Sequence, residues 1–230
     1  MKTAFLILTC FTLALLGYGL YQAIYAAPTE MTMGEIQRIF YYHVPSAWTA
    51  MVLFFANFVA SILYLATRRQ TVDAWAVSFA EVGVVFNTVV LVTGPLWAKP
   101  VWGIWWTWDA RLTTTLVLWL IYVSYLLLRR FSAGEQTATL AAVLAIFGFI
   151  DVPIVYMSIR WWRTQHPQPV ILGGPGSGID PAMKVALFTN WAAFLALAAM
   201  LAWLRYMLAK QEIDMEQAER NRSLANTEAR

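Results

Sequence analysis

Six long apolar runs are the feature of this 230-residue sequence that most restricts its fold. A helix needs about 20 mostly apolar residues to cross the hydrocarbon core of a bilayer, and each run is close to that length. Backbone amides in lipid must be hydrogen-bonded internally, and the alternating pattern of a membrane β-barrel is absent, so we predict helices. The fold class is an all-α polytopic membrane protein with six transmembrane helices. They are predicted at residues 4–26, 46–66, 77–97, 112–128, 138–159 and 184–208.

The composition excludes the main soluble classes of protein. Hydrophobic residues make up 60% of the chain and charged residues 13%, against roughly 45–50% and 25% in an average soluble protein. This leaves too few polar residues to cover a soluble surface, which rules out an ordinary cytosolic enzyme, a disordered protein and a nucleic-acid binder. Cys10 is the single cysteine, so the chain has no dithiol chemistry. A P-loop motif is also absent, which argues against ATP hydrolysis by this chain.

The distribution of lysine and arginine predicts the orientation. Cytoplasmic loops of membrane proteins carry an excess of lysine and arginine. Slightly more of these residues fall on the side of the termini, including arginine pairs in two short loops, so we predict that both termini are cytoplasmic. These residues are Lys2, Arg68, Arg69, Arg129, Arg130, Arg205 and Lys210, against Arg38, Lys99, Arg111, Arg160, Arg163 and Lys184 on the other side. We expect residues 1–210 to form one membrane domain and 211–230 a polar cytoplasmic tail. The first run is longer than a typical signal peptide core, so we expect it to be retained.

The outer connection 27–45 contains the first histidine of the chain. Thr32 and Glu35 have the spacing of a capping box, which predicts the start of a short helix along the membrane surface. His43 would lie at the end of that surface helix, on its apolar side. Pro45 then suits the first turn of the second span.

The outer connection 97–111 is rich in tryptophan. It holds five of the twelve tryptophans of the chain and ends at Asp109 and Arg111. On a helical stretch, a large flat surface rimmed by charge would form from Trp102, Trp105, Trp106 and Asp109. Such a surface suits a planar apolar ligand with acidic edges. An interfacial aromatic belt that binds no ligand is the alternative.

The outer connection 160–183 carries His166, the second of the two histidines. Neutral imidazole is the commonest metal ligand, and heme iron is commonly held by histidine. Two axial imidazoles would hold a porphyrin from opposite faces, with tryptophan over its rings and arginine at its propionates. A catalytic zinc site made of both histidines and Asp109 stays open. Asp151, within the fifth span, is either functional or a partner for amides freed by Pro153.

Three motifs, in order, carry a resemblance to a known family. The tryptophan-rich segment resembles the WWD signature of heme-handling proteins, and both histidines lie in matching flanking motifs. The residues are Trp102-Gly-x-Trp105-Trp106-x-Trp108-Asp109-Ala-Arg111, His43-Val-Pro-x-Ala-Trp48 and Trp161-Trp162-x-Thr-x-His166. Over residues 30–210 the chain is most similar to the heme exporter protein C family of the cytochrome c maturation system. Gln165 and Pro167 depart from the leucine and glutamine expected around the second histidine.

The resemblance implies a function and a set of site residues. Heme b would be held transiently at the outer surface, with His43 and His166 as axial ligands of the iron. The tryptophan platform would consist of Trp102, Trp105, Trp106, Trp108 and Asp109, and we add Arg111 as a propionate partner. The heme would pass to a membrane-anchored chaperone in the periplasm, and covalent attachment to that chaperone is a step the chain would promote.

The resemblance also implies partners and a location. The partners are a small single-span subunit and the membrane and ATPase subunits of an ABC transporter, in the bacterial inner membrane. Two other functions stay open, a b-type electron-transfer subunit and a transporter or scaffold without a heme site. The electron-transfer function predicts histidine pairs inside the spans, whereas here both histidines are predicted at helix ends.

Overall fold

The computed structural model describes residues 2–132, 134, 136–171 and 178–228 of the chain. These residues are almost entirely helical, and no named β-strand occurs among them. Within this described part, six helical segments are long and apolar enough to cross a membrane, which agrees with the prediction, and each contains one of the predicted runs. The segments are Thr3–Ala26, Glu35–Thr67, Gln70–Trp102, Ala110–Phe131, Thr137–Trp161 and Pro181–Glu219.

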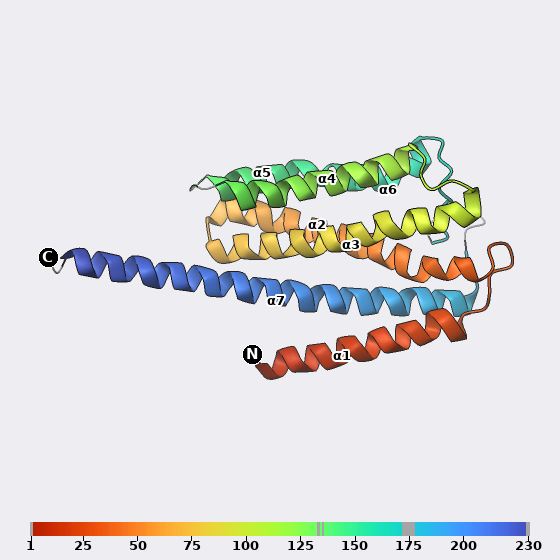
Figure 1. The fold of residues 1–230 in the computed structure, drawn as a ribbon, viewed down its shortest axis with the longest axis horizontal. Helices are drawn as coiled ribbons and strands as arrows, with labels where there is room; N and C mark the ends of the chain where they lie inside the picture. The colour runs from red at the N-terminus through yellow and green to blue at the C-terminus, as the bar shows by residue number, and fades with distance from the viewer. Residues whose placement is uncertain (1, 133, 135, 172–177, 229–230) are drawn as a thin grey trace.

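The helices are arranged in layers (Figure 1). α2 (Phe40–Thr67) and α3 (Gln70–Trp102) pack against each other in the middle. On one side lies α7 (Pro181–Glu228), with α1 (Lys2–Tyr21) packed on its outer face. On the other side lie α4 (Ala110–Phe131), α5 (Thr137–Phe149) and α6 (Asp151–Trp161).

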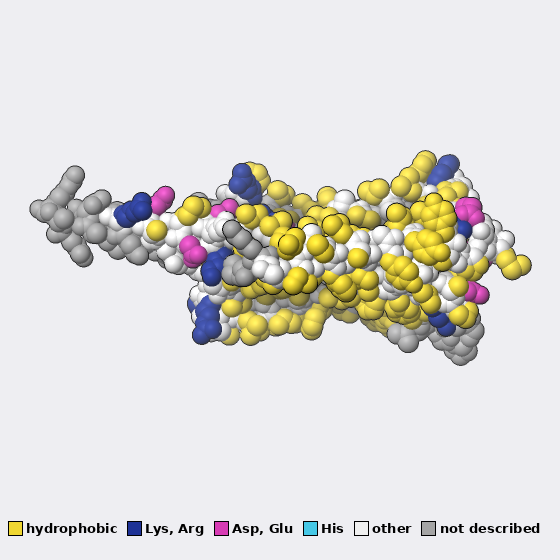
Figure 2. All heavy atoms as spheres, turned by 90° about the horizontal axis from the view of Figure 1, so that it is seen from below, with side chains coloured by type: hydrophobic (Ala, Val, Ile, Leu, Met, Phe, Trp, Pro, Cys, Tyr) yellow, Lys and Arg dark blue, Asp and Glu magenta, His cyan; other side chains and the backbone are white. Residues whose placement is uncertain are grey.

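The distribution of side chains fits a membrane. Figure 2 shows apolar side chains over the middle of one face, with lysine, arginine and acidic side chains at its two ends. The described chain ends lie at the same end of the bundle, away from the connections 27–34, 103–109 and the described residues 162–171 and 178–180 of the third connection (Figure 1). We call the end with these three connections the loop end. The predicted polar tail continues α7 as far as residue 228, and residues 229–230 lie outside the described part.

The short helix before the second span differs from the one expected. It is a five-residue 3-10 turn, Glu35–Ile39, that runs directly into α2. The predicted capping box does not form, because Glu35 accepts a hydrogen bond from Thr29 and the residue before the turn is Gly34. His43 therefore belongs to α2 rather than to a separate surface helix.

Proline accounts for two features of the spans. Pro45 lies inside α2, where it leaves the carbonyl of Tyr41 without its usual helical donor. Pro153 has the same effect on the carbonyl of Phe149, and the fifth span is broken there into α5 and α6. The two halves still form one membrane-length segment.

Close helix contacts hold the bundle together. Gly83 of α3 packs against the ring of Phe54, and a Cβ atom added at Gly83 would lie 2.6 Å from that ring. The Phe54 ring in turn stacks on Tyr122 of α4, with ring centroids 3.8 Å apart. At the end opposite the loop end, Arg129 forms a two-point ion pair with Asp73. α3 is thus tied to α2 and to α4 well away from the loop end.

Candidate functional site

A large cavity opens at the loop end of the bundle. Its walls come from α2, α3, α4 and α6 and from the connections 27–34, 103–109 and the one after α6, and most of the lining is apolar. The inner end reaches Asn87 and Leu118. The cavity therefore extends between the helices, deeper than the surface-exposed platform that we expected from sequence.

His43 projects from α2 into this cavity and is only 8% exposed. Its Nδ1 atom lies 2.8 Å from the Oγ1 atom of Thr93 on α3. The Thr93 hydroxyl donates its one hydrogen to the carbonyl of Val89, 2.7 Å away. Thr93 must then accept from His43, so the proton of the imidazole is on Nδ1. Nε2 of His43 makes no hydrogen bond within the described part of the chain and carries a free lone pair.

His166 reaches the same cavity from the connection after α6. Its Nδ1 atom lies 2.9 Å from the carbonyl oxygen of Pro167, which is only an acceptor, so Nδ1 again carries the proton. Its backbone amide donates to the hydroxyl of Thr164, which fixes the loop locally. Burial, together with the nearby Arg111 cation, lowers the pKa of His166 to about 4. The imidazole is therefore neutral at physiological pH, as a metal ligand must be.

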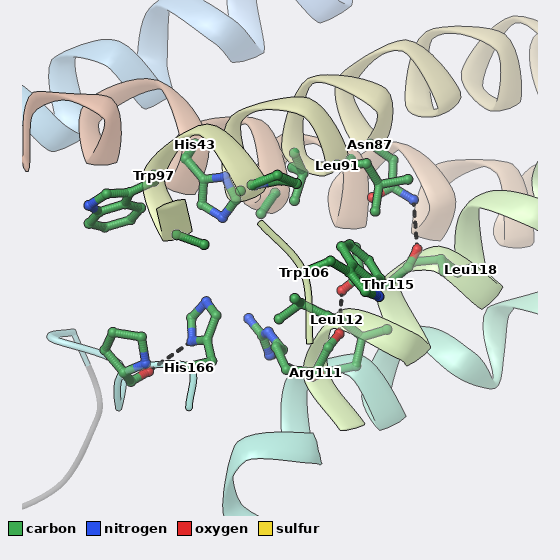
Figure 3. A pocket seen from close by; sticks show the side chains of 18 of the residues that line it. His43, Asn87, Leu91, Trp97, Trp106, Arg111, Leu112, Thr115, Leu118 and His166 are labelled. Carbon is green, nitrogen blue, oxygen red and sulfur yellow. Dashed lines mark hydrogen bonds between the residues drawn. The ribbon is translucent and has the colours of Figure 1, made fainter. Parts of the chain in front are cut away.

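The two histidines face each other across the cavity. Figure 3 shows the ring nitrogen of His166 that is not bonded to Pro167 pointing toward the ring of His43. Both rings thus donate through Nδ1 and present an unprotonated Nε2. Metal-bound histidine usually donates its other N–H to a protein acceptor, which is the arrangement of both residues here. Chemically, the pair is able to ligate one metal centre from two sides.

Arg111 supplies positive charge beside His166 (Figure 3). It is the one lysine or arginine in the described lining of the cavity. Its Nη1 atom donates to the carbonyl oxygens of Val155, at 2.5 Å, and Tyr156, at 3.4 Å. These two bonds fix the guanidinium against α6. An anionic group of a ligand would find its counter-charge here.

The tryptophan-rich segment does not form the continuous helical face that we predicted. α3 ends at Trp102, and Gly103 follows with φ +78°, a conformation that favours glycine. Because the chain then leaves the helix, its tryptophans divide into two groups. Trp102 and Trp106 line the cavity, together with Trp97. The other two point outward and are more than half exposed, namely Trp105 (55%) and Trp108 (76%).

Asp109 has a structural role in this arrangement. It is the N-cap of α4, and its Oδ1 atom accepts a hydrogen bond from the amide of Leu112 at 3.1 Å. Its Oδ2 atom accepts from the hydroxyl of Thr107 at 3.0 Å. Asp109 is not among the lining residues. Its carboxylate therefore shapes the turn that places Trp106 and Arg111 in the cavity wall.

The structure bears on the zinc alternative. No three histidine, cysteine, aspartate or glutamate side chains gather closely enough to hold a metal ion among the described residues. Asp109 is engaged in capping α4, so it does not complete a zinc site with the two histidines. An iron centre that carries its own four equatorial ligands would need only the two imidazoles.

Sequence reasoning did not find some residues of the site. Thr93 contacts His43 but is not in the cavity lining. It lies in an apolar run of the third span, where a threonine that bonds its own helix is common, so nothing marked it. Met33 and Asn87 line the cavity but lie outside the three motifs. The glycine-rich residues 172–177, part of the predicted connection 160–183, lie outside the described part of the chain.

The six-helix bundle, with two imidazoles facing one cavity, defines the class of this protein as a multi-pass membrane protein with a candidate ligand site at one end. The family model for CcmC, described as heme exporter protein C, matches residues 1–223. The chain belongs to the heme exporter protein C family.

Individual relatives agree with this assignment. The heme exporter protein C of Bradyrhizobium diazoefficiens is 36% identical over 191 residues, which cover 83% of this chain and 72% of the relative. That of Escherichia coli K12 is 36% identical over 180 residues, covering 78% and 72%. A Marchantia polymorpha protein, named as a cytochrome c biosynthesis ccmC-like mitochondrial protein, is 36% identical over 194 residues, which cover 84% of this chain and 82% of the relative.

Proposed function

We propose that this chain handles heme for cytochrome c maturation, binding it in the cavity between His43 and His166. The observation that carries the proposal is the matched hydrogen bonding of the two imidazoles, in which each Nδ1 has a partner and each Nε2 has none among the described residues. Two such ligands complete the axial coordination of a porphyrin iron. Family membership supports heme as the cargo.

The rest of the cavity fits the same ligand. Its apolar and aromatic walls suit a planar apolar macrocycle, and Arg111 offers a partner for a propionate. The indole N–H groups of Trp97 and Trp106 are buried without an acceptor among the described residues. Buried indoles usually find one, so acceptor atoms of a ligand would satisfy a need that the protein leaves open. The cargo in this proposal is heme b.

Delivery follows from the same arrangement. In the proposal the heme passes to a membrane-anchored chaperone in the periplasm, and the exposed Trp105 and Trp108 lie beside the mouth where that chaperone would dock. His166 is on a loop, so one of the two ligands is able to leave without a helix moving. The chain has no P-loop, so ATP hydrolysis belongs to associated ABC transporter subunits, with a small single-span subunit completing the complex. The chain promotes covalent attachment to the chaperone by presenting heme.

The proposed location is the bacterial inner membrane. The loop end faces the periplasm and both termini are cytoplasmic. Support comes from two arginine pairs at the end of the termini: Arg68-Arg69 is in the connection between α2 and α3, and Arg129-Arg130 is in the last turn of α4.

Loading of the chaperone tests the proposal. The double variant His43→Ala, His166→Ala is expressed with the ABC subunits and the chaperone, and covalent heme on the chaperone is measured by peroxidase stain. We expect loading to fall at least about tenfold, because both proposed ligands of the iron are removed. Gln165→Ala, beside the second histidine but outside the lining, is the control and should load normally. Normal loading by the double variant would reject heme ligation and favour a scaffold.

The electron-transfer alternative is weaker, because such a cytochrome holds its histidine pairs inside the spans. His43 is in the first turn of α2, at the loop end of its span. His166 is on a loop and outside the six spans. A bound heme that exchanges electrons but never reaches the chaperone would favour this alternative.

A further inference from the structure

The residue that fixes the orientation of His43 is Thr93, which belongs to none of the three sequence motifs. It lies on α3, next to Gly94, whose backbone packs on the imidazole. A Cβ atom added at Gly94 would lie 3.4 Å from Cε1 of His43. The ring also meets Trp97 edge to face, with ring centroids 5.9 Å apart. One stretch of α3 thus surrounds the first histidine, and Thr93 provides its hydrogen bond.

The direction of that hydrogen bond follows from the protons available. A threonine hydroxyl has one hydrogen and two lone pairs. The hydrogen is directed to the carbonyl of Val89, at 2.7 Å, which leaves the lone pairs to accept from Nδ1 of His43, at 2.8 Å. The carbonyl of Val89 therefore sets the Thr93 hydroxyl, and the hydroxyl sets the tautomer of the imidazole.

We propose that Thr93 is a positioning residue that holds the Nε2 lone pair of His43 toward the iron of the bound heme. The proposal rests on the proposed function for the identity of the ligand, but the tautomer itself does not depend on heme. Without the hydroxyl, the imidazole loses the partner that keeps its proton on Nδ1. The ring is then free to rotate or to carry the proton on Nε2, and in the second case it offers no lone pair to the iron.

The expected loss of heme affinity is the size seen when the hydrogen-bond partner of a metal-ligating side chain is removed in other proteins. Loss of such a partner typically lowers affinity about 10–100-fold. Thr93→Val removes the hydroxyl and keeps the shape, so we expect a loss of heme affinity in that range. Thr93→Ser keeps the hydroxyl and should bind heme nearly as the wild type does.

Thr88 provides a matched control on the same helix. Its hydroxyl also donates to the carbonyl four residues earlier, Val84, at 2.7 Å, and accepts from a ring N–H, that of Trp119, at 2.8 Å. Thr88 does not line the cavity. Thr88→Val makes the same chemical change away from His43, so it should leave both the tautomer of His43 and heme binding unchanged.

The measurement uses the full chain in detergent, labelled with ¹⁵N-histidine and free of heme. Because the chain has only two histidines, His166→Ala assigns both sets of signals. The wild type, Thr93→Ser and Thr88→Val should show His43 protonated on Nδ1, whereas Thr93→Val should show proton density on Nε2. Titration of the same samples with ferric heme then gives the affinities.

Two results would separate the claims. An unchanged His43 tautomer in Thr93→Val, or equal losses of heme affinity in Thr93→Val and Thr93→Ser, would overturn the role of Thr93 alone. A wild-type chain that binds no heme at any concentration, with the tautomer shift still present, would overturn heme ligation while leaving the hydrogen-bond assignment in place.

Discussion

Arg111 is joined to Val155 by a hydrogen bond from Nη1 to the backbone carbonyl oxygen, 2.5 Å long. The bond connects the first turn of α4 to α6 across one wall of the cavity. It also holds a guanidinium beside His166, where it contributes to keeping that imidazole neutral. A single side chain thus links the packing of two helices to the charge inside the candidate site.

Arg111→Met should weaken binding of heme about tenfold, or roughly 1.4 kcal/mol, because a charge-assisted bond to a propionate is lost. Titration with heme dimethyl ester separates this effect from any shift of α4, since the ester has no carboxylates. Wild type and Arg111→Met should bind the ester equally. Arg163→Met is the control, because Arg163 is exposed and outside the cavity lining. Equal losses for heme and its ester would contradict the propionate role.

Asp109 should tolerate replacement by asparagine better than by alanine. Asparagine caps a helix about as well as aspartate, whereas alanine at an N-cap costs about 0.5–2 kcal/mol. We therefore expect Asp109→Asn to keep both thermal stability and chaperone loading, and Asp109→Ala to lower both. Thermal unfolding in detergent and the loading assay provide the two readouts. If Asp109→Asn is as defective in loading as Asp109→Ala while remaining stable, the carboxylate acts on the cargo directly.

The two groups of tryptophans should give different defects. Trp106→Leu, within the cavity wall, should lower retention of heme by the isolated chain. Trp108→Leu, at an exposed position, should retain heme but transfer less of it to the chaperone. Heme content after purification and chaperone loading are measured for each, with Trp203→Leu as the control, because Trp203 packs on Phe5 instead. Identical defects in both variants would argue for one continuous platform.

Two glycines of α1 provide a matched test of its packing on α7. A Cβ atom at Gly19 would lie 2.9 Å from Oδ1 of the buried Asn190. A Cβ atom at Gly17 would have no described atom within 4 Å, apart from its chain neighbours and the backbone of its own helix. Gly19→Ala should lower stability by about 1–3 kcal/mol through overpacking. Gly17→Ala should be neutral or stabilising by up to about 1 kcal/mol, because alanine is the better helix former. Unfolding in a denaturing detergent ranks the two, and equal stability would contradict close α1–α7 packing.

The spans were predictable because one physical rule dominates them. A run of apolar residues long enough for the bilayer must be helical there, whatever it packs against, so all six predicted runs lie within observed helices. The ends were less predictable. Pro45 suggested the beginning of a span, but the 3-10 turn Glu35–Ile39 continues into α2 and places the proline inside it.

The cavity was predictable only in part. His43, His166, Arg111, Trp102 and Trp106 were expected together and line one cavity, whereas Trp105, Trp108 and Asp109 were expected with them and do not line it. Trp105 and Trp108 point outward because the chain leaves the helix at Gly103, whereas the residue spacing of the segment favours a continuous helix.

Thr93 shows a different limit of sequence reasoning. Its role depends on a contact between α2 and α3, and the spacing of residues within one helix does not reveal such a contact.

The most direct test of heme ligation by the two histidines is a spectrum. The full chain is purified in mild detergent, supplied with ferric heme, and examined by visible absorption and electron paramagnetic resonance beside His43→Ala and His166→Ala. We expect the wild type to be low-spin with two imidazole ligands, and each variant to lose one ligand, bind heme more weakly and become high-spin. Wild-type spectra and affinity in both variants would contradict the account.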